Sequence, residues 1–322
     1  MKRKKLSIII ITKNEESTID ACLREANKIN FIEKEIILVD SNSTDKTIEI
    51  ARKYPIKIIK IIKSNVYSPS AGRRIGLTNS KGDYILFLDG DQIVNREWIK
   101  KYIALIKLGC FDLVDGGYIH VPYGERVREF KAILNKNPIG KPGNKFHGTF
   151  LVRNSKTLKK ENFNPFMRGE EERDLAYRLI KKGYKIYRSQ EEIAAHFLKK
   201  EDTLEVKEKL KFMIGIGQIF KRHIFSRFYL NILKDFKWFF IVISIIILYF
   251  FILIFNKYLA FFFILFIFII LLAKNKFKIN NILLIIIKDL LMPVKVIEGI
   301  FLEIFEKRKF KYKKEIIKSL SK

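Results

Sequence analysis

The sequence has very little cysteine and lacks the common phosphate-binding loops. Cys22 and Cys110 are the only two cysteines among 322 residues, and they stand far apart and match no metal-binding spacing. We expect both to pack inside a protein of the reducing cytosol. Neither G-x-G-x-x-G after the first apolar run nor G-x-x-x-x-G-K-S/T at any position is present. These absences exclude a standard dinucleotide-binding or P-loop enzyme.

Acidic residues are scarce relative to basic ones. The chain has 34 Asp and Glu against 62 Lys and Arg, a net charge of +28, and is 48% hydrophobic. Such a balance is typical of proteins that bind nucleic acid or an anionic membrane surface. No RNA- or DNA-binding motif is visible, and the basic residues crowd around 199–237, 274–278 and 307–322, beside the most apolar segments. We therefore expect a membrane as partner and no nucleic acid.

The first residues lack the features of a signal peptide. The apolar stretch 6–11 is too short for a signal core, has no small-residue cleavage site and runs directly into charged residues. We interpret it as a β-strand.

Short apolar runs and helical patterns alternate through the first half of the chain. Strands are expected at 6–12, 35–40, 56–62 and 84–88, and helices at 17–29, 43–54 and 70–79. This alternation predicts right-handed βαβ units and a mostly parallel sheet with helices on both faces.

Further along, the pattern is weaker. We expect a pair of strands within 112–121, a loop-rich stretch over 122–146 and a strand at 147–153. An acidic helix start near 170 should lead to a helix that ends at Gly183, followed by two short strands, the second ending near His196.

The stretch "GDYILFLDGDQIV" (82–94) runs from a buried strand into two aspartates, Asp89 and Asp91. Paired carboxylates repel each other and lose hydration on burial, so they favour either a divalent metal site or a polar Asp-Gly turn. Thr12, Asp40 and Asp89 each follow a predicted strand, and the carboxyl ends of parallel strands form the ligand-binding edge of such sheets. If these polar residues only formed turns, a separate turn would be needed at each of the three strand ends. A single ligand-binding cleft would account for all three.

Four segments resemble the family 2 glycosyltransferases of GT-A fold, in the order that the family shows. They are "SIIIITKNEE", "ILVDSNSTDKT", "SAGRRIGLTNSKGDYILFLDGD" and "GEEERDLAYRL", spread over residues 6–198. The second is similar to the nucleotide loop V-D-D-G-S-x-D, with Ser41 and Asn42 in place of Asp-Gly. The third contains the D-x-D motif. The fourth resembles E-D-x-D/E-L-x-x-R, with Glu172 where the family has Asp.

The resemblance implies a divalent cation, Mg²⁺ or Mn²⁺, that bridges the donor diphosphate. Asp91 would be a metal ligand, Asp89 would lie near the ribose and the metal, and His196 would approach the metal or the diphosphate unless it is structural. Oxygen ligands suit these hard cations, which neutralise charge on the leaving nucleotide diphosphate.

The remaining implied roles concern binding of the sugar donor and the catalytic base. Asp40 would contact the nucleotide base, with Thr12 and Glu15 shaping the same pocket. Arg73 would contact the diphosphate, although a solvated helix face is an equal alternative and Arg74 competes for the role. Glu172 is the expected catalytic base, with Glu171 beside it; the alternative is that both cap a helix start.

The last third of the chain is expected to lie at a membrane. Residues 236–273 predict a hairpin of two transmembrane helices, since runs of 18 and 16 apolar residues are separated only by Asn256 and Lys257. Amphipathic surface helices are expected at 201–235, and an interfacial helix with a basic cytoplasmic tail at 274–322. The basic flanks place the catalytic domain, residues 1–200, on the cytoplasmic side.

We therefore expect a multi-pass membrane enzyme, an inverting glycosyltransferase of glycan or polysaccharide assembly. It would move a sugar from a nucleotide-diphosphate-sugar to a hydroxyl of a lipid-linked acceptor. Residues 218–222 ("QIFKR") depart from the Q-x-x-R-W motif of the processive synthases, so one sugar per encounter is expected. The alternatives are a polyprenyl-phosphate sugar synthase, a non-catalytic membrane scaffold and, least favoured, a nucleic-acid binder at the membrane surface.

Overall fold

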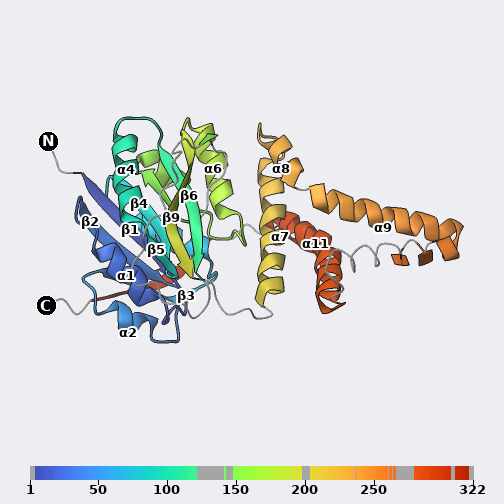
Figure 1. Cartoon of the computed structure of the whole chain (residues 1–322), viewed down its shortest axis with the longest axis horizontal. Helices are drawn as coiled ribbons and strands as arrows, with labels where there is room; N and C mark the ends of the chain where they lie inside the picture. Colours follow the sequence, from blue (N-terminus) through green and yellow to red (C-terminus); the bar gives the residue numbers. More distant parts are fainter. Residues whose placement is uncertain are drawn as a thin grey trace. The chain divides into compact units, whose positions relative to one another are not determined.

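The computed structural model describes residues 4–121, 141–142, 148–197, 204–235, 237–259, 261–262, 264–265, 279–305 and 309–318. The chain divides into two compact units. The sheet unit comprises the described residues of 1–167, 171–200 and 309–322, and the helical unit those of 168–170 and 201–308 (Figure 1).

One sheet of ten strands forms the centre of the sheet unit. Its order is β10 (Tyr312–Ile317), β3 (Lys57–Ser64), β2 (Glu33–Asp40), β1 (Lys5–Thr12), β4 (Tyr84–Asp89), β8 (Phe150–Arg153), β6 (Leu113–Val121), β9 (Ile186–Phe197) and β5 (Gln92–Val94), with β7 (Lys141–Pro142) paired to β9.

The first four strands along the chain confirm the predicted βαβ pattern. β1 pairs in parallel with β2 and β4, and β2 in parallel with β3, with α1 (Ile19–Asn27), α2 (Thr47–Ala51) and α3 (Pro69–Asn79) in the connections. For the other strands the prediction of a mostly parallel sheet is wrong, although β6 and β9 also pair in parallel. β8 runs antiparallel to both β4 and β6, and β5 and β10 run antiparallel to their neighbours. The sheet is therefore mixed.

Helices cover both faces of the sheet, as expected. Ile8 and Ile10 of β1 belong to a core that includes side chains of α1 and α4 (Arg96–Lys107). Ile9, which points to the other face, lies in a core with α3, α5 (Lys156–Glu161) and α6 (Glu171–Lys181). Because successive side chains of a strand point to opposite faces, one β-branched run supplies both cores.

Helix α3 lies unusually close to β1. Ser68 caps its start by accepting a hydrogen bond from the Ala71 amide at 3.1 Å, and Pro69 occupies the first turn, where no amide hydrogen is needed. A Cβ atom at Gly76 would overlap the Cγ2 atom of Ile9, and one at Gly72 would lie 3.0 Å from the Cγ2 atom of Ile11. The two glycines allow the helix to approach the strand, which brings Arg73, the residue after Gly72, close to the end of β4.

Two predicted strand pairs are single strands. Residues 112–121 were expected to form a pair of strands, but β6 continues through Gly116 and Gly117 as one strand beside β9. The register shifts at these glycines, and a Cβ atom at Gly116 would lie 2.5 Å from the Glu191 carbonyl oxygen. The glycines therefore mark a β-bulge and a close approach of backbones. β9 likewise replaces the two short strands expected before His196. The loop expected over 122–146 lies outside the described residues except for β7.

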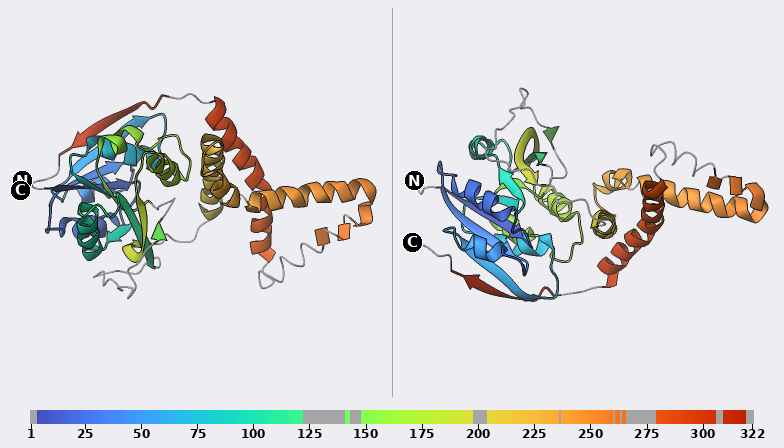
Figure 2. Two further views of the ribbon diagram at one scale, coloured as in Figure 1. Left: turned by 90° about the horizontal axis from the view of Figure 1, so that it is seen from above. Right: turned by 60° about the horizontal axis from the view of Figure 1, so that its bottom comes forward.

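The end of the chain adds an edge strand that the sequence did not predict. β10 pairs antiparallel with β3, and in Figure 2 it runs along this edge of the sheet. The side chain of Asn65 donates to the Lys309 carbonyl at 3.0 Å and accepts from the Lys311 amide at 3.1 Å. Ile317 is 8% exposed and belongs to the core that includes α1. The part of the expected basic tail that the structure describes is therefore integrated into the sheet unit.

The helical unit contains α7 (Leu204–His223), α8 (Tyr229–Asp235), α9 (Lys237–Phe255) and α11 (Ile279–Phe305). α7 and α11 are in close contact, since a Cβ atom at Gly217 would overlap the Val296 carbonyl and one at Gly299 that of Ile214. α7 lies within the segment 201–235 that was expected to form membrane-surface helices. One side of it is covered by α11.

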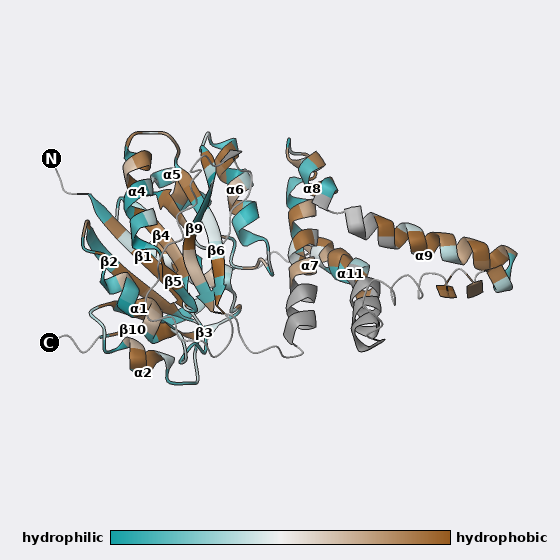
Figure 3. Ribbon diagram, viewed as in Figure 1, coloured by the Kyte–Doolittle hydropathy of each residue, from teal (hydrophilic) through white to brown (hydrophobic). Residues whose placement is uncertain are grey.

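Figure 3 shows α9 coloured as hydrophobic along most of its length. No helix in the described part of the chain is both long and apolar enough to cross a membrane. The expected transmembrane hairpin is therefore not supported, and most of its second segment lies outside the described residues.

Candidate functional site

The polar ends of the first strands converge, as the sequence predicts. Thr12 and Asp40 are register partners at the ends of β1 and β2, and Ile11 pairs with Asp89 at the end of β4. The turn that follows is closed by the Gly90 amide, which donates to the Ile11 carbonyl at 2.9 Å. The carboxyl edge of the sheet thus gathers three of the expected donor-binding residues.

Asp40 is completely buried and is held by the loop that follows it. Its Oδ2 atom accepts from the Ser43 amide at 2.9 Å, and its Oδ1 atom accepts from the Ser43 hydroxyl. Burial raises the pKa of Asp40, and the hydrogen bonds from Ser43 act against this shift. Beside it, the Oγ1 atom of Thr12 is buried and has no hydrogen-bond partner among the described residues. A hydroxyl left in this state is available to a ligand.

Glu15 lies against the Asp-Gly-Asp turn. The Thr18 hydroxyl is 3.2 Å from both the Glu15 Oε2 atom and the Gly90 carbonyl oxygen. A Cβ atom at Gly90 would lie 2.8 Å from the Thr12 Oγ1 atom, so the turn has no space for a side chain there. Glu15 therefore packs against the turn, and its expected place in the nucleotide pocket stays a prediction.

Asp91 and His196 come together through the pairing of β5 with β9. The Asp91 carbonyl accepts from the Phe197 amide at 2.9 Å, and the Nε2 atom of His196 lies 3.5 Å from the Asp91 Oδ2 atom. The Oδ1 atom of Asp91 is buried without a hydrogen-bond partner among the described residues. One carboxylate oxygen thus faces an imidazole and the other lacks a donor.

The residues around Asp91 fit a divalent cation in charge and ligand type. Asp89, Asp91, Glu171 and Glu172 place an excess of negative charge at this edge, and an orphaned carboxylate oxygen is a ligand suited to Mg²⁺ or Mn²⁺. Across the described residues, however, no three His, Cys, Asp or Glu side chains stand together as a complete metal site. The metal set Asp91, Asp89 and His196 therefore stays a prediction.

Arg73 occupies the centre of the acidic cluster and not a solvated helix face. Its side chain is 4% exposed. The Nη2 atom lies 2.8 Å from the Asp89 Oδ1 atom, and the Nη1 atom lies 2.9 Å from a carboxylate oxygen of each of Glu171 and Glu172. Burial of the guanidinium opposes its charge, but these carboxylates outweigh it and raise the pKa of Arg73. Arg74, the competing candidate, donates instead to the Phe163 carbonyl at 2.8 Å.

Glu171 and Glu172 begin α6, where the helix dipole favours negative charge. Burial, together with the neighbouring Glu171 carboxylate, raises the pKa of Glu172 to about 8, although Arg73 acts in the opposite direction. A carboxyl group with a pKa near neutrality has the proton affinity that general-base catalysis requires. Glu172 therefore has a proton affinity suited to a base, and its assignment as the base stays a prediction.

Several polar residues near the site were not singled out from the sequence. Gln92 is 2% exposed; its Oε1 atom accepts from the Asp89 amide at 3.1 Å and from the Thr149 hydroxyl. The Tyr118 hydroxyl accepts from the Thr149 amide at 3.0 Å, and the His120 ring lies 5.6 Å from the His196 ring. Gln92 and His120 are both register partners of His196 on β9 and so share a face of the sheet with it. The alternation of side chains along β5 and β6 predicts this only when the pairing of both strands with β9 is known.

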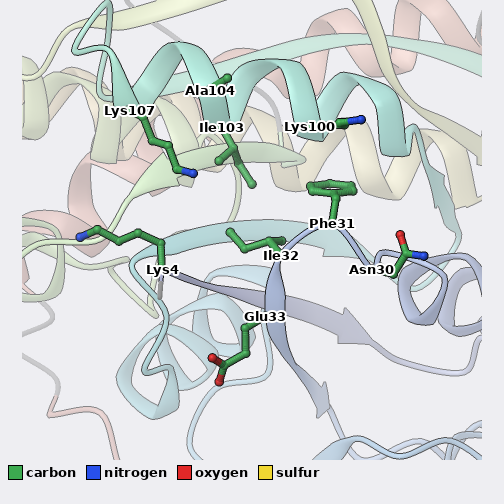
Figure 4. A pocket seen from close by; sticks show the side chains of 9 residues that line it. All are labelled: Lys4, Asn30, Phe31, Ile32, Glu33, Lys100, Ile103, Ala104 and Lys107. Carbon is green, nitrogen blue, oxygen red and sulfur yellow. The ribbon is translucent and has the colours of Figure 1, made fainter. Parts of the chain in front are cut away.

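A separate hollow of about 850 Å³ lies away from this cluster. Phe31, Ile103 and Lys107 are among its lining residues, and Figure 4 shows it between α4 and the loop before β2. β1 and β2 begin there, whereas Thr12 and Asp40 lie where these strands end. The hollow is thus at the opposite edge of the sheet from the acidic cluster.

A mixed α/β sheet that carries Asp-x-Asp at a strand end, with an acidic helix start facing it, defines a glycosyltransferase of GT-A type. The family model "Glycosyl transferase family 2" matches residues 7–169. The chain belongs to this family.

The chain is similar to several characterised members. It is 36% identical over 112 residues to a cholesterol galactosyltransferase of Borreliella burgdorferi, covering 34% of this chain and 31% of the relative. It is 34% identical over 107 residues to the poly(ribitol-phosphate) beta-N-acetylglucosaminyltransferase TarS of Staphylococcus aureus, covering 32% and 19%. A dolichol-phosphate mannosyltransferase of Pyrococcus furiosus is 30% identical over 140 residues, covering 42% and 39%. These matches span less than half of each relative.

The fold is similar to that of S. aureus TarS residues 1–349 in complex with UDP-GlcNAc. The two chains superpose with a TM-score of 0.51 at 21% sequence identity, covering 72% of this chain and 80% of TarS 1–349. This likeness supports the GT-A type of fold.

Proposed function

We propose that this protein transfers one sugar from a UDP-sugar to a hydroxyl group of a lipid-linked glycan, with inversion at the anomeric carbon. The observation that carries the proposal is that Arg73 contacts both Asp89, at the strand ends where the donor would bind, and Glu172, at the acidic start of α6. UDP is favoured as the nucleotide because the similar fold of TarS is described with UDP and with UDP-GlcNAc.

The donor would bind along the strand ends. Asp40 would accept a hydrogen bond from the nucleotide base, and the free Thr12 hydroxyl would donate one to the same base. Asp89 would lie near the ribose. Mg²⁺ or Mn²⁺, held by Asp91 with Asp89 and His196 near it, would supply positive charge to the leaving diphosphate. The orphaned Asp91 oxygen supports this placement.

Transfer requires a base on the acceptor side. Glu172 would take the proton of the acceptor hydroxyl as its oxygen bonds to the anomeric carbon, while the bond from that carbon to the diphosphate breaks and UDP leaves. The pKa of about 8 supports Glu172 in this role, because its carboxylate is basic enough to accept a proton near neutral pH.

A membrane location of the acceptor is part of the proposal. Apolar side chains of α9 lie exposed, with Ile247 63%, Phe250 57% and Ile254 79% exposed, and such a surface suits a lipid environment or an amphiphilic partner. A cytoplasmic catalytic domain anchored at the membrane would meet its acceptor on one surface. Flotation of the full chain with anionic vesicles should place it in the lipid fraction; recovery with the unbound protein would remove this part of the proposal.

The donor assignment can be tested by titrating UDP and GDP into the full-length protein with and without Mn²⁺. We expect UDP to bind in the presence of the metal and to lose at least about tenfold in affinity in Asp91→Asn. Asp20→Asn is the matched control, because the side chain of Asp20 is 51% exposed and pairs with Arg24. Absence of binding by either nucleotide would overturn the proposal.

A polyprenyl-phosphate sugar synthase is the second candidate. The similarity to a dolichol-phosphate mannosyltransferase favours it. A phosphate acceptor is already ionised and needs no base, so Glu172→Gln should retain most activity if this candidate is correct. Loss of activity in the same variant would favour the hydroxyl acceptor.

A further inference from the structure

The buried guanidinium of Arg73 contacts both Asp89, where the sugar donor would bind, and Glu172, the expected catalytic base. Arg73 comes from α3, Asp89 from the end of β4, and Glu171 and Glu172 from the start of α6. These elements lie far apart in sequence and meet at one guanidinium, with its Nη atoms 2.8 and 2.9 Å from the carboxylates.

The geometry leaves Arg73 little freedom to bind a ligand directly. Both Nη atoms already face carboxylates, and the side chain is 4% exposed. A side chain at position 148 would overlap the Nη2 atom, so Gly148 closes the space on that side. A donor diphosphate could reach the guanidinium only by displacing one of these carboxylates, which would then be left buried without its cation.

We propose that Arg73 is a positioning residue, which holds the base Glu172 at a fixed place relative to Asp89 and does not contact the donor. The inference rests on the proposed function, since it takes Glu172 as the base and Asp89 as a donor-side residue. A planar guanidinium fixes the direction of each carboxylate it binds, whereas an ammonium acts as a point charge. The close approach of α3 to β1 through Gly72 and Gly76 places the guanidinium at this junction.

The role predicts a separation between nucleotide binding and catalysis. In Arg73→Met, kcat should fall by at least about 100-fold, while the Kd for UDP in the presence of Mn²⁺ should change by less than about threefold. A diphosphate contact predicts the reverse, because loss of a charged hydrogen bond to the donor weakens UDP binding directly. A rise of tenfold or more in the Kd for UDP would therefore overturn the proposal.

A double-mutant cycle with Glu172→Gln tests whether Arg73 acts through Glu172. If it does, adding Arg73→Met to Glu172→Gln should lower kcat by less than about threefold further, since the interaction is already lost. Effects that multiply would show that Arg73 acts independently of Glu172 and would overturn the proposal. The double variant also removes one negative charge together with the guanidinium, so it should fold even if Arg73→Met alone does not.

Conservative and control variants complete the experiment. Arg73→Lys retains the positive charge but not the planar, two-pronged guanidinium. It should give a kcat between those of the wild type and Arg73→Met, with the Kd for UDP unchanged. Arg74→Met is the matched control from the same helix, as Arg74 binds the Phe163 carbonyl and no carboxylate of the cluster; it should keep kcat within about threefold of the wild type. A wild type that neither binds UDP nor transfers sugar would overturn the proposed function, and with it this inference, before any variant is compared.

Discussion

The Nε2 atom of His196 lies 3.5 Å from the Oδ2 atom of Asp91, across the antiparallel pair of β5 and β9. The imidazole therefore stands beside the carboxylate that we expect to hold the metal, as a ligand or as the group that orients it. Because β5 follows the Asp-Gly-Asp turn directly, the pairing fixes the turn and the histidine with respect to each other.

We predict that His196→Ala weakens the binding of Mn²⁺ in the presence of UDP by about 10- to 100-fold. Titration followed by electron paramagnetic resonance of free Mn²⁺ measures the change without any transfer reaction. His120→Ala is the control, since His120 is the exposed partner of His196 on β6. Equal weakening in both variants, or none in either, would contradict the role of His196.

Glu172 and Glu171 can be separated by isosteric substitution. For a hydroxyl acceptor, Glu172→Gln should lower kcat by about 10²- to 10⁴-fold, because it removes the proton acceptor while keeping the shape of the side chain. Glu171→Gln removes the neighbouring carboxylate and should cost less than about tenfold. Steady-state kinetics at saturating donor decides between them, and a larger loss in Glu171→Gln would move the base to that residue.

The pH dependence of transfer should follow the raised pKa of Glu172. A base must be deprotonated, so kcat/KM is expected to rise with pH and to level off above about 8, the pKa that burial gives this carboxyl group. A kcat/KM that is flat between pH 6 and 9 would argue against Glu172 as the base.

The pH dependence of stability that Glu172 contributes has the opposite sign to that of a carboxyl group whose pKa is lowered on folding. The folded state holds the Glu172 proton more tightly than the unfolded chain, whose pKa is near 4.5. Its contribution is therefore fully present below the unfolded value and is lost as the pH rises towards about 8. In denaturation series across this window, Glu172→Gln should be stabilised relative to the wild type as the pH increases.

Neighbouring isoleucines of β10 provide a matched pair for the edge strand. Ile317→Ala should lower the free energy of unfolding of the sheet unit by about 2–5 kcal/mol, since Ile317 is packed into the core. Ile316→Ala should cost less than about 1 kcal/mol, because Ile316 is 56% exposed. Hydrogen exchange at the amides of β3 and urea denaturation both measure the difference, and equal effects would contradict the packing of β10.

The sequence was sufficient for elements whose pattern is local. The β-branched runs of β1 and β2 and the Asp-x-Asp at the end of β4 predicted both the parallel half of the sheet and the convergence of Thr12, Asp40 and Asp89. These features depend on residues that are close in sequence, and the topology rules for βαβ units supply the rest.

Features set by distant partners could not be predicted in this way. Gly116 and Gly117 have the composition of a turn, and only the backbone of β9 beside them makes them part of a strand. Arg73 has the sequence context of an exposed helix, and its burial depends on carboxylates from β4 and α6. β10 carries two lysines and a glutamate among its six residues, and becomes a strand because β3 presents an open edge.

The position of β10 at the end of the chain also has a consequence for biosynthesis. Ser64 and Lys311, which are joined at this edge by a hydrogen bond, are separated by 247 residues. At about 5–20 residues per second, a ribosome needs roughly 12–50 s to make the intervening chain. During that interval the backbone groups at the outer edge of β3 have no β10 to pair with, and an unpaired strand edge is a template for association with other chains. In the nascent protein this edge of the sheet therefore stays open to association until β10 emerges.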